Sequence, residues 1–293
     1  MKNIIKLGIY IIVVILVYIF KDNISSFIMD KIIYRDNNTV LTYNEYYINN
    51  DYNFVQNLNT NTVNNRQEVL NMFYSIINSG TDTYSFKCNY NKCVDDVKSI
   101  LNDENTLAAI NNFVHPYNSF YYIDIYVTEI GKITVTPQRI YNSEHIAEIN
   151  KYIENFMVNN ITDDMSDYDK ILLFHDYIVN NTIYDDSEDK SSFNAYTLIT
   201  TGKSICGGYS DILSIYLNSI GIKNYKITSS NHVWNLVNID GSWLHLDATW
   251  DDPVASDGNQ YLLHNFFLIN TEELFKLDTV EHTFDRNVYS EAK

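Results

Sequence analysis

The sequence predicts an α+β protein in which one helix presents a cysteine and one β-hairpin presents a histidine and an aspartate. After Cys206, apolar residues recur at helical spacing, whereas the two runs that flank Asp240-Gly241 alternate apolar and polar residues as strands do. Helix and strand patterns also follow each other between residues 61 and 141. With 293 residues, of which 45% are hydrophobic and 19% charged, the chain is long and apolar enough to form one or two globular domains.

The composition limits the partners that the protein is expected to bind. A formal net charge of −17 repels a phosphate backbone, and no Lys/Arg cluster offsets it locally, so no nucleic-acid partner is expected. Cys88 and Cys93 lack a second Cys/His pair at zinc-finger spacing. Pro253 marks Asp251 and Asp252 as turn residues rather than metal ligands. We therefore expect neither a metal site nor another cofactor.

The first 21 residues have the pattern of a membrane anchor. The run from residue 7 to residue 20 contains no charged residue, and Lys2 and Lys6 precede it. Because no small-x-small cleavage site follows, we predict an uncleaved signal anchor over residues 1–21. It would cross the cell membrane once through residues 4–20 and leave the remainder of the chain extracellular. The alternatives are secretion after cleavage and a buried core helix.

Two regions follow the predicted anchor. Residues 22–60 are rich in Asn and Tyr, show weak periodicity and are predicted to form a stalk or linker. Residues 61–141 are predicted to form a small α+β domain of unknown role. Its patterns predict helices over 66–78 and 94–110, a strand over 83–88 and a hairpin of strands 121–128 and 133–140. In an extracellular protein, Cys88 and Cys93 are expected to close a local disulfide and leave Cys206 as a free thiol.

Residues 142–293 are predicted to be the catalytic domain. Apolar spacing predicts helices over 146–156 and 168–180, and Ser166 is a plausible N-cap for the second of them. A further helical run from 193 to 199 leads to the stop signal Gly202. The segment that contains Cys206 follows directly.

Cys206 lies at or just before the N-terminus of a helix that ends at Gly221. Backbone N–H groups and the helix dipole at that position favour a thiolate over a thiol. Gly207 and Gly208 are expected to keep side chains away from the sulfur, so that a substrate backbone can approach it. The N–H group of Cys206 is expected to form part of an oxyanion hole. Alternatively, the cysteine is a small apolar side chain that fills space in the core.

The hairpin places a histidine and a carboxylate on one face. Asp240-Gly241 is a preferred two-residue turn, and it fixes the register so that Trp234 faces Asp247. His232 and Asp247 then become diagonal neighbours, ~7–8 Å apart, within reach of a His–carboxylate hydrogen bond. His245 lies on the same face and competes with His232 for this role, and either histidine could instead be structural. Trp234 is interpreted as a core or pocket-wall residue.

Cysteine, histidine and aspartate together predict a reaction type. A thiol nucleophile needs a base, and the base needs a carboxylate that orients it. If Cys206, one hairpin histidine and Asp247 meet in space, they form the machinery for acyl transfer through a thioester.

These segments resemble the transglutaminase-like superfamily, and in particular its bacterial members, whose core is similar to that of papain-type cysteine proteases. The matching stretches are GKSICGGY (202–209), HVWNLV (232–237), WLHLDATWDD (243–252) and the upstream FHDYIVNNTIYD (174–185), which together cover roughly residues 168–268. The resemblance implies a papain-like core with Cys206 as nucleophile, His232 rather than His245 as general base and acid, and Asp247 as orienter. It implies Tyr196 as a second oxyanion donor or a pocket wall. The flanking β-sandwich domains and calcium sites of animal transglutaminases are not evident, so calcium control is not implied.

The resulting interpretation is a cysteine-dependent acyl transfer on peptide or protein amides at the cell surface. The substrate would be a protein or peptide, including cell-wall peptide. Water and a lysine amine both remain open as the group that resolves the thioester, so that peptidase and cross-linking activity are not distinguished. The alternatives are a non-catalytic module that binds peptide or cell-wall material on the same fold, and a cell-wall peptide amidase.

Overall fold

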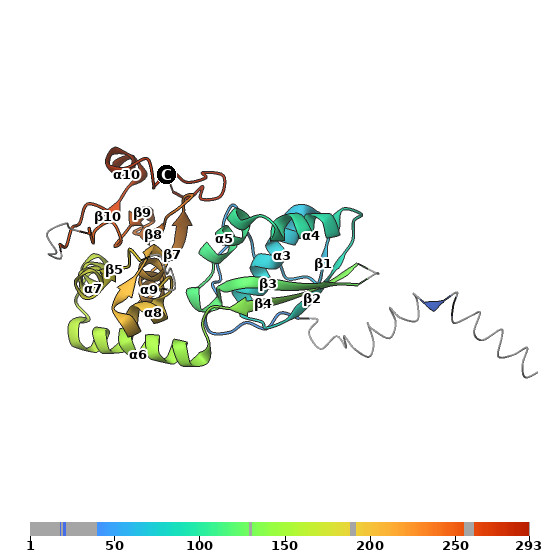
Figure 1. Cartoon of the computed structure of the whole chain (residues 1–293), viewed down its shortest axis with the longest axis horizontal. Coiled ribbons are helices and arrows are strands. Elements are labelled where there is room, and N and C mark those ends of the chain that lie inside the picture. Colours follow the sequence, from blue (N-terminus) through green and yellow to red (C-terminus); the bar gives the residue numbers. More distant parts are fainter. Residues whose placement is uncertain are drawn as a thin grey trace, which may run out of the picture.

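The computed structural model describes residues 18, 20, 21, 40–128, 131–187, 192–254 and 261–292. Helices and strands gather into two parts that lie side by side in Figure 1. We refer to residues 40–141 as the N-terminal part and to residues 142–292 as the C-terminal part. The α+β class predicted from the sequence is confirmed.

The N-terminal part combines a four-stranded sheet with helices. The sheet has the order β1-β2-β4-β3 and is antiparallel except for the β1–β2 pair. The elements are β1 (Thr62–Val63), α3 (Arg66–Ser79), β2 (Tyr84–Cys88), α4 (Cys93–Leu101), α5 (Glu104–Asn112), the 3-10 helix η2 (Pro116–Asn118), β3 (Phe120–Val127) and β4 (Lys132–Arg139). A disulfide joins Cys88 at the end of β2 to Cys93 at the start of α4.

One predicted helix of this part is divided in two. The run 94–110 forms α4 and α5, with the break at Asp103. The Asp103 carboxylate accepts hydrogen bonds from the backbone N–H groups of Asn105 and Thr106 and so caps the second helix. Apolar spacing continues across the break, and an aspartate that caps a new helix interrupts the backbone without interrupting that spacing.

The C-terminal part packs helices against a second, antiparallel sheet of order β10-β9-β8-β7. Its elements are α6 (Ser143–Asn160), α7 (Asp167–Asn181), β5 (Ile183–Tyr184), α8 (Ala195–Thr201), β6 (Lys203–Ser204), α9 (Cys206–Ser219), β7 (Asn224–Thr228), β8 (Val233–Ile239), β9 (Ser242–Leu246), β10 (Phe267–Ile269) and α10 (Thr271–Leu277). The short strands β5 and β6 form a separate parallel pair. Helix α9 is central, because it contacts α7 and α8 as well as strands β7 and β8.

The β8–β9 hairpin has the register that a two-residue turn predicts. Val237 pairs with Leu244, and the pairing continues toward the end of β9. Asp240 and Gly241 have φ angles of 51° and 85°, in the left-handed region that a type I′ turn requires. The turn therefore decides which side chains of the two strands share a face.

A continuous core joins the two parts. Phe73 of α3 belongs to the same cluster of buried side chains as Trp234 and Leu236 of β8. Where the parts meet, the ring centroids of Phe113 and Tyr225 lie 4.9 Å apart. One face of the C-terminal sheet is thus covered by the N-terminal part, while a second cluster that includes residues of α9 packs against the other face.

From residue 40 onward the chain belongs to the folded N-terminal part. Leu41, Tyr52 and Val55 are buried in the shared core, and the ring of Tyr52 lies 4.6 Å from that of Phe113. Residues 40–60 of the predicted stalk therefore pack against the fold. Single anchoring side chains hold this irregular segment, and such anchors leave no periodic pattern in a sequence. Residues 22–39 lie outside the described residues.

The predicted membrane anchor needs a correction. Except for residues 18, 20 and 21, the segment 1–21 lies outside the described residues. Within the residues that the structure describes, no helix has both the length and the apolar character needed to cross a bilayer. The uncharged run 7–20 is also shorter than the ~20 apolar residues that a spanning helix needs. The prediction of a single-pass membrane protein with an extracellular catalytic domain is therefore wrong.

Candidate active site

Cys206 is the first residue of α9. Ile205 before it has an extended backbone, with φ of −96° and ψ of 177°, so the helix begins at the cysteine. The thiol is free and partly exposed. Because the first N–H groups of a helix have no acceptor within the helix, the N–H of Cys206 needs a partner from outside α9.

Gly207 and Gly208 allow close packing at the start of α9. A Cβ atom on Gly207 would lie 2.4 Å from the carbonyl oxygen of Phe193, and one on Gly208 would lie 2.0 Å from Ser204 Oγ. The first turn of α9 is therefore pressed against the chain that leads into α8 and against β6. This differs from the expectation that the glycines leave room for substrate, because backbone fills that space.

The hairpin brings His232 and Asp247 into direct contact. His232 Nε2 lies 2.6 Å from Asp247 Oδ2, and both side chains are buried. The other carboxylate oxygen, Oδ1, accepts the backbone N–H groups of Thr249 at 3.0 Å and Trp250 at 3.3 Å. The carboxylate is held at both oxygens, so it can fix the orientation of the imidazole ring.

His232 also interacts with the thiol. Burial by itself lowers the pKa of His232, but the charge of Asp247 and the hydrogen bonds to Asp247 and Cys206 outweigh it and raise this pKa to about 10. Because Nε2 faces Asp247, Nδ1 is the ring nitrogen that remains for Cys206. A histidine beside a cysteine is the arrangement in which the imidazole can carry the proton of the thiol.

A second histidine, which the sequence analysis missed, reaches the same carboxylate. His282 Nε2 lies 2.9 Å from Asp247 Oδ2, and His282 Nδ1 lies 2.9 Å from Asp278 Oδ2. His282 is fully buried, and its ring stacks on Phe266 with centroids 5.1 Å apart. Each ring nitrogen of His282 therefore faces a carboxylate oxygen, which can only accept hydrogen bonds.

Asp247 is therefore the shared acceptor of two histidines. Burial raises its pKa, but the charges and hydrogen bonds of His232 and His282 outweigh burial and hold the pKa of Asp247 well below its ordinary range. The carboxylate stays ionised and orients His232 without taking its proton.

The competing histidine of the hairpin has a structural position. His245 Nδ1 accepts a hydrogen bond from Trp234 Nε1 at 3.0 Å, and its Nε2 lies 2.9 Å from Thr271 Oγ1. Burial and the neighbouring His282 lower the pKa of His245 to about 3, so its ring is neutral. The ring of Trp234 lies nearly parallel to that of His232, with centroids 5.5 Å apart. Trp234 is thus a buried support behind the base rather than the wall of an open pocket.

Tyr196 does not make the contact expected from the sequence, and a second tyrosine, Tyr184, interacts with Cys206 instead. The ring of Tyr196, expected as an oxyanion donor or pocket wall, stacks on His145 of α6 at 3.9 Å between centroids. Tyr184 of β5 is the tyrosine near the thiol: burial, followed by the charges at Cys206 and Glu281, raises its pKa. Strand β5 pairs with β6, which leads directly into Cys206.

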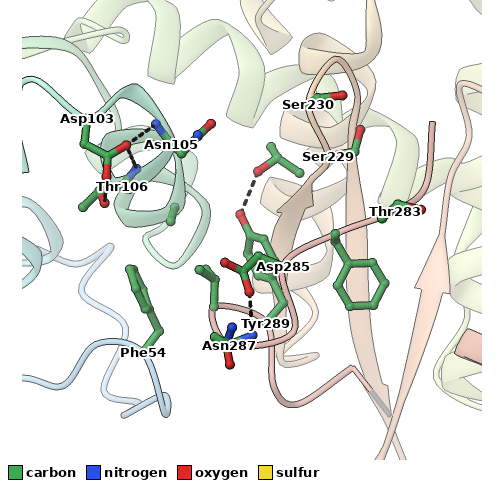
Figure 2. Close-up of a pocket in the computed structure, with 14 residues that line it drawn as sticks. Phe54, Asp103, Asn105, Thr106, Ser229, Ser230, Thr283, Asp285, Asn287 and Tyr289 are labelled. Atoms are coloured by element: carbon green, nitrogen blue, oxygen red, sulfur yellow. Dashed lines mark hydrogen bonds between the residues drawn. The ribbon is translucent and has the colours of Figure 1, made fainter. Parts of the chain in front are cut away.

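A pocket of about 530 Å³ lies beside this site, where the two parts meet. Figure 2 shows its labelled residues: Phe54, Asp103, Asn105 and Thr106 from the N-terminal part, Ser229 and Ser230 from the β7–β8 turn, and Thr283, Asp285, Asn287 and Tyr289 from the C-terminal segment. Cys206 does not line it. Two lining residues connect the pocket to the site. Ser229 Oγ accepts the backbone N–H of His232 at 3.2 Å, and Thr283 directly follows His282 in the chain.

A cysteine at a helix N-terminus, followed by a histidine and an aspartate on one antiparallel hairpin, defines the Cys-His-Asp class of sites. Residues 155–248, about a third of the chain, match the model of the transglutaminase-like superfamily. The match contains Cys206, His232 and Asp247 and confirms the resemblance noted in the sequence, whereas His282 lies beyond it. A comparison with curated protein sequences gives no match.

Three solved structures align with the chain at low similarity. A TGase is 15% identical with a TM-score of 0.33, over 60% of this chain and 55% of the other. A candidate cysteine protease from Cytophaga hutchinsonii is 13% identical with a TM-score of 0.29, over 48% of this chain and 65% of the other. Menin, which has a binding site for the mixed lineage leukemia protein, is 13% identical with a TM-score of 0.31, over 52% of this chain and 41% of the other. The aligned region spans less than two thirds of the length of each of these proteins.

Proposed function

We propose that the protein is a cysteine-dependent acyl-transfer enzyme that acts on an amide carbonyl of a peptide or protein through a thioester. The observation that carries the proposal is the hydrogen bond between His232 and Asp247, together with the effect of Cys206 on the pKa of the same imidazole. It supplies a nucleophile, a proton carrier and an orienting carboxylate in the order that amide chemistry needs.

In the first half-reaction, Cys206 Sγ attacks the amide carbonyl carbon, and the carbonyl π electrons move onto the oxygen. The N–H of Cys206 is placed to donate to that oxygen. When the tetrahedral intermediate collapses, His232 transfers its Nδ1 proton to the amine nitrogen, the C–N bond breaks and a thioester remains on Cys206. Asp247 stabilises the imidazolium throughout without being protonated.

In the second half-reaction, water or a primary amine replaces the departed amine. His232, now neutral, removes a proton from this nucleophile at Nδ1 while the nucleophile attacks the thioester carbonyl. The C–S bond breaks and the thiolate returns. Water gives a peptidase and a lysine amine gives a cross-linking enzyme, and the same three residues serve both reactions.

Labelling of the thiol tests the nucleophile. Iodoacetamide at neutral pH is expected to modify Cys206 in the folded protein, as measured by intact-protein mass spectrometry, and to leave Cys206→Ala unmodified. His232→Asn should slow labelling by about 10²- to 10⁴-fold. The matched control His145→Asn changes a partly exposed histidine on α6 and should label at the wild-type rate. An unreactive Cys206 in a folded protein would favour a non-catalytic peptide-binding module instead.

The acceptor is tested with a mixture of glutamine-containing peptides and a primary amine, analysed by mass spectrometry. Amine-linked products would identify a transferase, and shortened peptides would identify a peptidase. Either product should disappear in Cys206→Ala. If unlabelled wild-type protein, whose thiol reacts fully with iodoacetamide in a parallel sample, gave neither product, the proposal of amide chemistry would fail.

A further inference from the structure

Helix α7 and the segment before β10 bring three metal-ligand side chains together on the C-terminal part. His175 Nδ1 lies 2.9 Å from Asp176 Oδ1, and His264 Nε2 lies 2.7 Å from the same oxygen. All three ligand atoms lie within 4.8 Å of one another. The cluster uses none of the residues of the Cys-His-Asp site.

The cluster is anchored in the core and open to solvent on one side. His175 is fully buried, whereas the side chains of Asp176 and His264 are 30% and 44% exposed. An ion could therefore enter from solvent and bind the rigidly packed His175 together with Asp176 and His264, whose exposed side chains can adjust. Asp176, together with the nearby carboxylate of Asp251, would balance a divalent charge.

The far side of the buried imidazole gives an independent reason to expect an ion. His175 Nε2 lies 3.3 Å from Asp251 Oδ2, and both atoms are buried without a hydrogen-bond partner among the described residues. With a metal ion on Nδ1, the proton of the neutral ring lies on Nε2 and bonds to Asp251. A histidine ligand whose other nitrogen donates to a carboxylate is the usual surrounding of a bound metal.

We propose that His175 Nδ1, Asp176 Oδ1 and His264 Nε2 bind one transition-metal ion of the zinc type, with solvent as the fourth ligand. Two imidazoles and one carboxylate suit zinc, whereas calcium and magnesium prefer oxygen ligands. In a tetrahedral zinc site, neighbouring ligand atoms lie about 3.3 Å apart, so the cluster needs to open by about half an ångström. This site was not expected from the sequence, which lacks a metal-binding spacing around these residues.

The ion would link α7 to the segment around Phe266, which forms hydrogen bonds with Asp247 and Asp251. Asp251 Oδ1 accepts the backbone N–H of Phe266, and the backbone N–H of Asp247 donates to the carbonyl of Phe266. His264 lies two residues before Phe266 and would be fixed by the ion. The proposed role is therefore structural: it holds the strand segment beside Asp247, and no catalytic step uses the metal.

Metal binding is best measured on chelator-treated Cys206→Ala protein, which lacks the competing thiol. Titration with Zn²⁺ against a chromophoric chelator should give one ion per chain, and Co²⁺ should give the visible absorption of a four-coordinate site. His264→Ala should weaken Zn²⁺ binding by at least about 100-fold. His145→Ala removes a partly exposed histidine elsewhere and should bind as the parent does. Ca²⁺ and Mg²⁺ should not compete.

A second variant, at Asp251, keeps the shape of the side chain and removes its negative charge. Asp251→Asn would place an N–H donor against His175 Nε2, force the proton onto Nδ1 and weaken Zn²⁺ binding by about 10- to 100-fold. Circular dichroism of each variant confirms folding. The proposal would be overturned if folded protein bound no Zn²⁺, if His264→Ala bound as tightly as its parent, or if only His282→Asn abolished binding. Nitrogen NMR that showed both His175 nitrogens protonated in the presence of Zn²⁺ would overturn it as well, since His175 would then be an imidazolium between two carboxylates.

Discussion

One carboxylate oxygen, Asp247 Oδ2, serves two histidines, at 2.6 Å for His232 and 2.9 Å for His282. Asp278 holds the far nitrogen of His282, so four side chains form a single hydrogen-bonded line behind Cys206. All except Asp278 are buried below a tenth of their surface. Because buried polar groups exchange partners with water only at high cost, this line fixes the ring orientations of both histidines.

His282 is expected to act as a positioning residue. His282→Asn removes the second donor to Asp247, and the loss of one hydrogen bond to a charged group should slow iodoacetamide labelling of Cys206 by about 10- to 100-fold. The pH profile of labelling should shift as well, because the environment of His232 changes. Asp285→Asn, three residues further along the same segment, is the control and should leave the rate unchanged. A wild-type rate for His282→Asn at every pH would rule out the positioning role.

The protonation of His232 gives a pH dependence of stability. Folding raises its pKa from 6.5 to about 10, so its contribution to the free energy of unfolding is fully present below about 6.5 and lost as the pH rises through about 10. Denaturant unfolding at pH 6, 8 and 10 should show this decline. In Cys206→Ala the pKa of His232 should be lower, because the thiol contributes to the increase, and NMR titration of the ring measures it directly. A wild-type His232 that titrates near 6.5 would contradict an ion pair between His232 and Asp247.

A helix start predicts the position of Cys206, and a two-residue turn predicts a hairpin histidine beside Asp247. These local rules leave His232 and His245 as alternatives, and only the family resemblance selects His232. His282 follows no such rule: it comes from an irregular tail, and its four-residue spacing from Asp278 acquires meaning only when that tail folds over the hairpin. Tyr184 is similar, since only the β5–β6 pairing brings it near the thiol.

The hairpin turn is the element on which the site depends. At Gly241 a Cβ atom would meet nothing within 4 Å, so only the positive φ of 85° disfavours a larger residue. Gly241→Val should therefore lower the free energy of unfolding by about 1–2 kcal/mol and slow Cys206 labelling as the strands lose their register. Asp240→Asn, which tolerates the same backbone conformation, is the matched control. Denaturant unfolding measures both variants, and equal stabilities would show that the turn does not set the register.

Periodicity was reliable for helices and strands that bury one face, and it failed where backbone chemistry overrides spacing. The carboxylate of Asp103 ends one helix and begins the next without disturbing the apolar pattern. The glycines after Cys206 are predicted to leave room for substrate, whereas in the structure the approach of Phe193, 14 residues before Gly207, constrains the first of them.

At the scale of the whole molecule, the two parts depend on each other for their core. Tyr225, Trp234 and Leu236 of the C-terminal sheet are covered by side chains of the N-terminal part. No sequence pattern reports such docking, because the apolar face of a sheet looks the same whichever element covers it. The 61–141 and 142–293 division stays a prediction about sequence regions, whereas the core crosses it.

The segment 142–293 alone is therefore expected to be unstable. Exposing three large side chains that are now buried removes about 1.5–3 kcal/mol each, which is comparable to the about 5–15 kcal/mol that stabilises a typical domain. Thermal unfolding followed by circular dichroism should show no cooperative transition for the segment and a cooperative one for the full chain. A segment that melts like the full chain would show that the N-terminal part is dispensable for folding.

The contact of Phe113 with Tyr225 also decides how this protein would respond to random mutation. A screen for lost activity would recover substitutions at Phe113 beside those at Cys206, although the two residues lie in different parts. Cooling would restore the first group, whose defect is a loosened core, and would leave the second group inactive. Loss of a buried benzyl side chain in the N-terminal part would then be detected in the same screen as loss of the thiol.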